Sequence, residues 1–171
     1  MYFYYFQTVT FIYMTVPVNP TDQPVVLQKI RHFCSYQERC IREVEEKLKE
    51  WAVQQVKIPP LINQLQKEGF LNEERFVKSF AGGKFRLFKW GRHKIEYELR
   101  KRGVPELMIQ EGLFEIDEEE YRETLKEIII RKKNEIKSGK SVNIRRNIIN
   151  FAYGKGFEMD LILGIVKELK I

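Results

Sequence analysis

Apolar residues recur at intervals of three and four positions along most of the chain from Val25 onward, which is the period of an amphipathic α-helix. Ser35 and Glu38 have the spacing of a capping box, in which the two side chains accept backbone N–H groups at the start of a helix. The apolar residues near them form one stripe that ends close to Trp51, so the pattern predicts a single helix there. The capping spacing recurs from Asp117, at the start of a longer predicted helix.

Proline and glycine mark the ends of the other predicted helices. Two prolines begin a helix over 59–69 and Gly69 stops it, because proline suits the first turn and glycine suits the left-handed residue after the last. Asn72 caps the next helix, which we expect to end at Gly82 and Gly83 and to be followed by a loop rich in Lys and aromatic residues. Further helices are expected over 92–102, 105–109, 117–137, 141–151 and 159–169.

Three stretches of the chain, 57–62, 103–108 and 156–161, are alike, and each follows an amphipathic helix. Their spacing of roughly 50 residues indicates a three-helix unit that occurs three times and stacks on its neighbours to bury its apolar face. We therefore expect an all-α fold of three tandem three-helix repeats that form an elongated curved body. The expected repeats cover 25–71, 72–116 and 117–171. Chance similarity between helix ends is the alternative, because Gly, an apolar residue and Pro often occur together there.

The first 24 residues differ from the rest, since residues 1–18 are largely aromatic and β-branched and contain no Lys or Arg. A secretory signal needs a basic start and a small-residue cleavage site, and a membrane span needs about 20 apolar residues, so neither is predicted. We expect residues 1–24 to be a flexible, irregular leader, and translation to begin at Met14. The intact mass of the native protein tests this start, because a mass that includes Tyr2 to Tyr13 contradicts it.

The composition is typical of a globular protein. Of the 171 residues, 43% are hydrophobic and 32% are charged, which fits neither intrinsic disorder nor a bundle of membrane spans. The two cysteines, Cys34 and Cys40, are expected to lie in one helical region and to face different directions. They predict no disulfide framework and favour a cytoplasmic location. His32 and His93 are the only imidazoles, so no metal site and no cofactor are predicted.

Charge is segregated along the chain, although the net charge is a modest +6. The segment 84–102 has eight Lys and Arg residues against Glu96 and Glu98, and the segment 131–146 has seven against Glu135. The rest of the chain is therefore acidic overall. Part of that negative charge comes from a run of acidic residues, Glu111, Glu115, Asp117, Glu118, Glu119, Glu120 and Glu123. A protein with separate positive and negative faces can bind a polyanion with one and a basic protein surface with the other.

Helical geometry predicts which basic residues point outward. At about 100° per residue, Lys94, Tyr97 and Lys101 lie on the face opposite the apolar residues of their helix. The helix that begins at 141 has the same construction, with Arg146 and Tyr153 outward. Cations beside an aromatic ring suit phosphate contact and stacking on a base. A solvated basic face explains either helix alone equally well, but its recurrence in two repeats favours binding.

The predicted loop over 84–90 combines Lys84, Arg86 and Lys89 with aromatic residues. Two glycines precede Lys84, but the segment lacks the earlier glycine and the Ser or Thr of a phosphate-binding loop, and it follows a helix instead of a strand. For Phe85 and Trp90 we expect packing between helices, whereas the cations are candidates for phosphate contact.

The sequence shows no catalytic arrangement. Glu118, Glu119 and Glu120 begin a predicted helix, where the helix dipole stabilises carboxylates without any acid or base role. Cys34 and His32 lie in one short segment that has no third group to orient them. We therefore predict a protein that is not an enzyme.

Three segments are similar to those of a known family. They are Phe70-Leu71-Asn72-Glu73-Glu74-Arg75-Phe76, Lys89-Trp90-Gly91-Arg92-His93-Lys94-Ile95 and Leu99-Arg100-Lys101-Arg102-Gly103-Val104. With Gly156-Phe157 they make the chain resemble the bacterial RecX family of RecA regulators from about residue 27 to residue 169. The family usually has Asp in the acidic pair where Asn72 and Glu73 stand here, a change that keeps the helix-capping chemistry.

The resemblance implies three tandem three-helix repeats that bind RecA filaments on DNA and modulate recombination and the SOS response without catalysis. The charges imply basic faces toward single-stranded DNA in the filament and an acidic surface toward RecA. We expect a monomer that inhibits RecA. The alternatives are a sequence-tolerant single-stranded nucleic-acid-binding helical repeat protein and a purely protein-binding scaffold. The candidate filament-binding residues are Lys84, Arg86, Lys89, Arg92, Lys94, Tyr97, Lys101, Arg102, Arg131, Lys132, Lys133, Lys140, Arg145, Arg146 and Tyr153.

Overall fold

The regular elements of this protein are helices throughout the part of the chain that the structure describes, residues 22–136 and 141–171 of a computed structural model. The all-α fold class is confirmed. The chain divides after Glu73 into two compact units. Met14, the rest of the predicted leader up to residue 21, and Lys140 lie outside the described residues.

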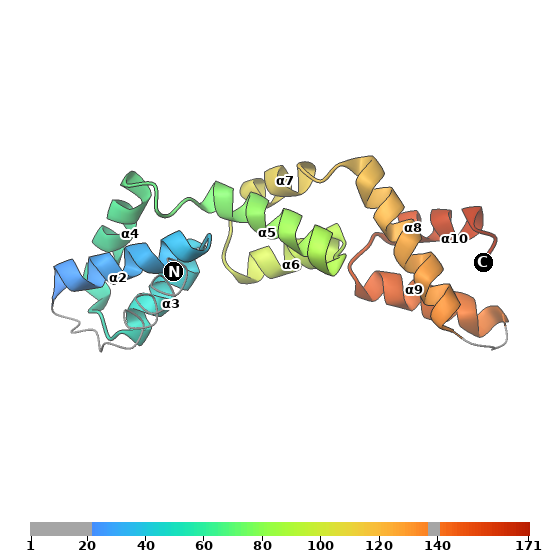
Figure 1. The fold of residues 1–171 in the computed structure, drawn as a ribbon, viewed down its shortest axis with the longest axis horizontal. Helices are drawn as coiled ribbons and strands as arrows, with labels where there is room; N and C mark the ends of the chain where they lie inside the picture. Colours follow the sequence, from blue (N-terminus) through green and yellow to red (C-terminus); the bar gives the residue numbers. More distant parts are fainter. Residues whose placement is uncertain (1–21, 137–140) are drawn as a thin grey trace, which may run out of the picture. The chain divides into compact units, whose positions relative to one another are not determined.

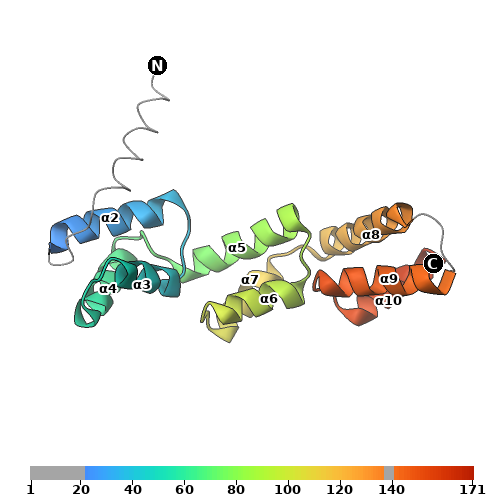
Figure 2. The ribbon, with the colours of Figure 1, turned by 90° about the horizontal axis from the view of Figure 1, so that it is seen from below.

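The first unit contains α2 (Gln23–Tyr36), α3 (Ile41–Glu50) and α4 (Ile58–Lys67), with a short 3-10 turn, η1 (Gln55–Lys57), before α4. The three helices lie against one another in both ribbon views (Figure 1, Figure 2). They enclose a core of buried side chains, Val26, Ile30, Cys34, Val44, Leu48, Val53, Ile58, Leu61, Ile62, Leu65 and Leu71.

The single helix predicted from Ser35 and Glu38 is wrong. Helix α2 begins after its cap, Asp22, and continues through Ser35. The Ser35 hydroxyl donates a hydrogen bond to the carbonyl of His32 at 3.0 Å, so it satisfies an acceptor in a last turn instead of a donor in a first turn. A serine can bond to backbone groups on either side, and the sequence spacing does not distinguish the two cases. Residues 37–40 are not helical, and they separate α2 from the start of α3.

The second unit contains α5 (Glu73–Phe88), α6 (Arg92–Lys101), α7 (Glu106–Phe114), α8 (Glu118–Glu135), α9 (Ser141–Gly154) and α10 (Met159–Glu168). Helices α8, α9 and α10 contact one another in pairs, and α6 contacts α7. Helix α5 approaches α7 closely at Gly112, where an added Cβ would lie 2.4 Å from Cγ1 of Val77. The unit therefore consists of two groups of three helices (Figure 2).

Helix α5 passes through Gly82 and Gly83, so the predicted stop and the predicted loop after it are wrong. The helix ends at Phe88, and the next residue, Lys89, has a φ of +54°, the left-handed conformation that glycine most often adopts. The N–H of Trp90 donates to the carbonyl of Lys84 at 3.3 Å and closes the end of the helix. Packing of the apolar face outweighs the roughly 1 kcal/mol that each glycine costs a helix relative to alanine.

The second and third helices of every group are joined by one kind of backbone turn. A residue with positive φ precedes a buried apolar residue: Ala52 and Val53, Gly103 and Val104, Gly156 and Phe157. The apolar residues donate their N–H groups to Leu48, Leu99 and Ala152, at 3.0, 3.3 and 3.3 Å. The sequence pattern placed the first turn too late, at 57–62, because alanine replaces glycine at 52 and η1 precedes α4. The shared turn supports the three-helix repeats, while their exact boundaries and the elongated curved body stay predictions.

Replacing Asp117 by alanine is expected to lower the free energy of unfolding by about 1 kcal/mol. As predicted from its spacing, Asp117 caps α8, and its Oδ1 accepts a hydrogen bond from the N–H of Glu120 at 2.8 Å. Alanine removes the acceptor, whereas Asp117→Asn keeps one and should cost much less. Chemical denaturation of the two variants measures the difference, and equal losses would contradict the capping role.

Candidate nucleic-acid interface

Two backbone segments touch where the second group of helices meets the third. The N–H of Gly91 donates to the carbonyl of Lys155 at 2.8 Å, and the N–H of His93 donates to the carbonyl of Gly156 at 3.1 Å. A Cβ on Gly91 would lie 2.2 Å from the carbonyl carbon and oxygen of Gly156, so only glycine allows this approach. The contact brings the ends of α5 and α9 together.

A buried tyrosine supports the same junction. The hydroxyl of Tyr121, on α8, accepts from the N–H of Arg92 at 2.9 Å and donates to Oε2 of Glu158 at 2.8 Å. Burial holds the pKa of Tyr121 well above its ordinary value, so the hydroxyl keeps the proton that it donates. The tyrosine ring lies between those of Phe85 and Phe157, with centroids 5.6 and 4.9 Å away. Phe85 therefore packs between helices, as predicted.

Lysine and aromatic side chains alternate beside this junction. The Nζ atoms of Lys94 and Lys84 lie 4.7 and 5.1 Å from the centroid of the Trp90 ring. Lys84 also lies 4.7 Å from the centroid of the Phe88 ring. On the other side, Nζ of Lys155 donates to the carbonyl of Phe88 at 3.2 Å, which links α9 to the end of α5.

The alternation continues into the third group of helices. The Nζ atoms of Lys155 and Lys132 lie 5.9 and 5.2 Å from the centroid of the Phe151 ring. We call the connected set the lysine–aromatic row: Lys94, Trp90, Lys84, Phe88, Lys155, Phe151 and Lys132. All of its side chains are at least partly exposed. Cation–π contacts hold the ammonium groups beside the rings, where phosphates and bases can reach both.

Comparison with known proteins gives the family of the chain. A family model described as RecX, second three-helix domain, matches residues 72–113. The chain is 28% identical to the regulatory protein RecX of Clostridium acetobutylicum over 132 residues and 28% identical to that of Bacillus cytotoxicus over 152 residues. These matches cover 75% and 89% of this chain. The chain belongs to the RecX family.

Solved RecX structures share the fold. The crystal structure of RecX from Lactobacillus salivarius matches with a TM-score of 0.77 at 23% identity, over 85% of this chain and 94% of that one. A second crystal structure of regulatory protein RecX matches with a TM-score of 0.78 at 19% identity, over 85% of this chain and 71% of that one. The chain spans 61% and 56% of the length of the Clostridium and Bacillus proteins.

The matched RecX domain contains four of the seven residues of the row. Residues 72–113 include Lys84, Trp90 and Lys94, and also Phe88 at the end of α5. The other residues of the row lie in α8, in α9 and directly after α9, beyond that domain. The row therefore depends on the packing of two three-helix groups, and neither group contains it alone.

Two of the predicted binding residues also take part in internal contacts. Arg92 pairs with Oε2 of Glu118 at 2.6 Å, and Arg102 pairs with Oε2 of Glu98 at 2.7 Å and lies 4.8 Å from the centroid of the Phe80 ring. The hydrogen bond from Arg102 lowers the pKa of the Glu98 carboxyl. Both arginines therefore contribute to packing within the second unit and lie outside the lysine–aromatic row.

The other predicted residues lie at or near the surface but outside the row. Arg86 folds back over its own helix, since a Cβ at Gly82 would lie 2.6 Å from its Nη2, and Lys89 forms the left-handed stop of α5. Tyr97 is 65% exposed and Tyr153 is 58% exposed, so both point outward as predicted. The remaining exposed members of the predicted set are Lys101, Arg131, Lys133, Arg145 and Arg146.

Two residues of the row, Lys155 and Phe151, were not among the predicted binding residues. Phe88 belongs to the aromatic loop that was expected over 84–90, and Trp90, for which packing between helices was expected, lies against Lys84 and Lys94. Phe151 lies on α9 and Lys155 is the first residue after it, and the N–H of Lys155 still donates to the carbonyl of Phe151 at 3.1 Å, so the helical spacing of four places the two side chains on one face. That spacing was a usable signal for Lys155.

Other kinds of site find little support in the described residues. Cys34 and Cys40 are both buried, on either side of the break between α2 and α3, and burial raises the pKa of the Cys34 thiol to about 11. A thiol that stays protonated at neutral pH is a poor nucleophile. Within residues 22–136 and 141–171, no group of three or more His, Cys, Asp or Glu residues could hold a metal ion. In the same ranges, no helix has both the length and the apolar character to cross a bilayer.

Proposed function

We propose that the chain is a non-enzymatic, cytoplasmic regulator that binds RecA nucleoprotein filaments as a monomer and inhibits RecA in recombination and DNA repair. The lysine–aromatic row is the observation that supports this most, together with membership of a family whose named members are regulatory proteins. In this proposal the row faces the DNA of the filament, and the acidic surface of α7 and the start of α8 faces RecA.

The chemistry of the row suits a single strand. Its four lysines supply positive charge for phosphates, and its rings, Trp90, Phe88 and Phe151, supply faces for stacking. Neither kind of contact depends on base identity, since every base has a π-face and every nucleotide has a phosphate. Binding would therefore follow the filament along any sequence.

The second candidate function is sequence-tolerant binding of bare single-stranded nucleic acid. The row favours it too, because lysines and rings need no protein partner to bind a strand. A purely protein-binding scaffold is the third candidate, in which the basic residues contact an acidic partner and DNA affinity is negligible.

Binding to bare single-stranded DNA, to RecA alone and to RecA on DNA, all at one salt concentration, separates the three functions. We expect the tightest binding to RecA on DNA, because only the filament offers both a strand and a protein surface. Equal affinity for bare DNA and for the filament would favour the second candidate. Binding to RecA alone, with none to DNA, would favour the third.

Salt is expected to weaken the binding of single-stranded DNA steeply. If about five phosphates are neutralised, the logarithm of the affinity should fall with the logarithm of the salt concentration at a slope of about −3 to −4, because counterion release scales with the number of contacts. Fluorescence anisotropy of a labelled oligonucleotide measures the slope. A slope near zero would remove the nucleic-acid role.

A further inference from the structure

Helix α7 has two large apolar side chains on its outer face that no described helix covers. Leu107 is 72% exposed and Phe114 is 92% exposed. They are seven residues apart, which places them on one face of the helix, with Glu111 between them. The opposite face of α7 is buried through Ile109 and Leu113, so this outer stripe is additional to the one that forms the core.

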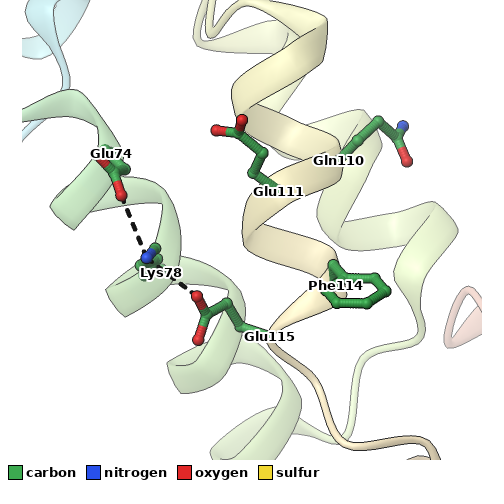
Figure 3. A pocket seen from close by; sticks show the side chains of 6 residues that line it. All are labelled: Glu74, Lys78, Gln110, Glu111, Phe114 and Glu115. Carbon is green, nitrogen blue, oxygen red and sulfur yellow. Dashed lines mark ion pairs between the residues drawn. The ribbon is translucent and has the colours of Figure 1, made fainter.

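Phe114 lies between two hollows of the second unit. One hollow, of about 610 Å³, lies between α5 and α7 and is lined by Glu74, Lys78, Gln110, Glu111, Phe114 and Glu115 (Figure 3). The other, of about 670 Å³, lies toward α6 and the start of α8. The Phe114 ring belongs to the lining of both, so a side chain of a partner could enter on either side of it.

Carboxylates surround the ring. Lys78 is the one cation in the lining of the first hollow, and its Nζ is held between Glu74 at 3.2 Å and Glu115 at 3.0 Å (Figure 3). One lysine therefore serves two carboxylates, and Glu111 adds a third negative charge without an ion pair among the described residues. The lining of the second hollow includes Glu96, Asp117, Glu118 and Glu158 against Arg92 and His93. The surface around Phe114 is negative on both sides.

We propose that Leu107, Gln110, Glu111 and Phe114, the Phe114 ridge, dock a protein segment that presents an apolar side chain flanked by Lys or Arg. The negative charge around Phe114 favours a basic partner, because it repels an acidic segment or a DNA phosphate and attracts Lys or Arg. An exposed aromatic ring beside open hollows is the kind of anchor that gives an interface most of its affinity. The inference rests on the proposed function, in which the RecA protomers of the filament supply that segment.

Phe114→Ser tests the ridge. We expect binding to RecA filaments on single-stranded DNA to weaken at least tenfold, while binding to bare single-stranded DNA stays unchanged because the lysine–aromatic row is intact. Glu111→Lys should weaken filament binding several-fold, because it reverses the charge beside the ring. Both side chains are exposed, so the melting temperature should not move. Tyr36→Ser is the matched control, since Tyr36 is an aromatic residue that is 73% exposed on α2 of the first unit, and it should bind like the wild type.

Each outcome has a separate meaning. If the wild type binds the filament and Phe114→Ser binds as tightly, the inference is overturned and the proposed function is unaffected. If the wild type does not bind the filament, the proposed function and the inference both fail. An equal loss of bare-DNA affinity in Phe114→Ser would make the ridge part of the DNA surface and overturn the inference. Light scattering that shows a wild-type dimer and a Phe114→Ser monomer would identify a second copy of the chain as the occupant, and would also overturn it.

Discussion

Replacing Gly91 by alanine is expected to lower the free energy of unfolding by about 1 to 3 kcal/mol and to disturb the junction of α5 and α9. The new Cβ would lie 2.2 Å from the carbonyl carbon and oxygen of Gly156, and main-chain atoms cannot move aside as the end of a flexible side chain can. Gly91 has a φ of −78°, which alanine adopts freely, so the effect is steric and not conformational.

Gly83→Ala is the matched control with the opposite expected sign. Nothing lies within 4 Å of a Cβ at Gly83, which is inside α5, so alanine should stabilise the protein by about 0.5 to 1 kcal/mol through helix propensity. Denaturant unfolding followed by circular dichroism measures both variants. Because the lysine–aromatic row crosses the junction, Gly91→Ala should also bind single-stranded DNA more weakly, and Gly83→Ala should not. A Gly91→Ala variant as stable as the wild type would show that the two backbones do not touch.

Reversing the charges of Lys84 and Lys155 together is expected to weaken binding to single-stranded DNA by about a hundredfold. Two charge-assisted contacts of roughly 1.5 kcal/mol each give a factor of about 100 in the dissociation constant. The double variant, Lys84→Glu with Lys155→Glu, should also have a salt slope that is shallower by about 1.4, because two phosphate contacts are lost. Neither lysine is in the buried core, so helicity should be preserved.

Lys49→Glu with Lys67→Glu controls for net charge. Both lysines are exposed, on α3 and α4 of the first unit, and the change in charge is the same as in the double variant of the row. We expect its DNA affinity to fall only slightly, through the general loss of positive charge. If both double variants lose affinity equally, the effect belongs to net charge. If the Lys84 and Lys155 variant binds as the wild type does, the row is not the DNA surface.

Local signals in the sequence determined much of the fold. The apolar spacing predicted an all-α chain, and Asp117 was correctly predicted to cap α8. Gly69 was predicted to be the left-handed residue after its helix, and its φ is +77°. These features depend on interactions within a few residues of one another, so the sequence pattern contains the information needed to predict them.

Local signals failed where two local outcomes have similar free energies. The Ser35 side chain can form a hydrogen bond with a carbonyl earlier in the chain or with an N–H group later in it, and the packing of α2 favours the carbonyl of His32. Gly82 and Gly83 weaken a helix without ending it, and the apolar face of α5 kept the helix going to Phe88. In both cases the deciding free energy came from the core, which the local pattern does not describe.

Which charges and rings lie together depends on how the helices pack. Lys155 and Phe88 are 67 residues apart and meet because Gly91 and Gly156 allow two backbones to touch. The same packing pairs Arg92 with Glu118, which is 26 residues away in the sequence. The pattern of charges along the sequence predicted that the chain has basic helix faces. Which lysines form a continuous surface depends on contacts between distant segments, and such contacts have no periodic signature in the sequence because they depend on how whole helices pack.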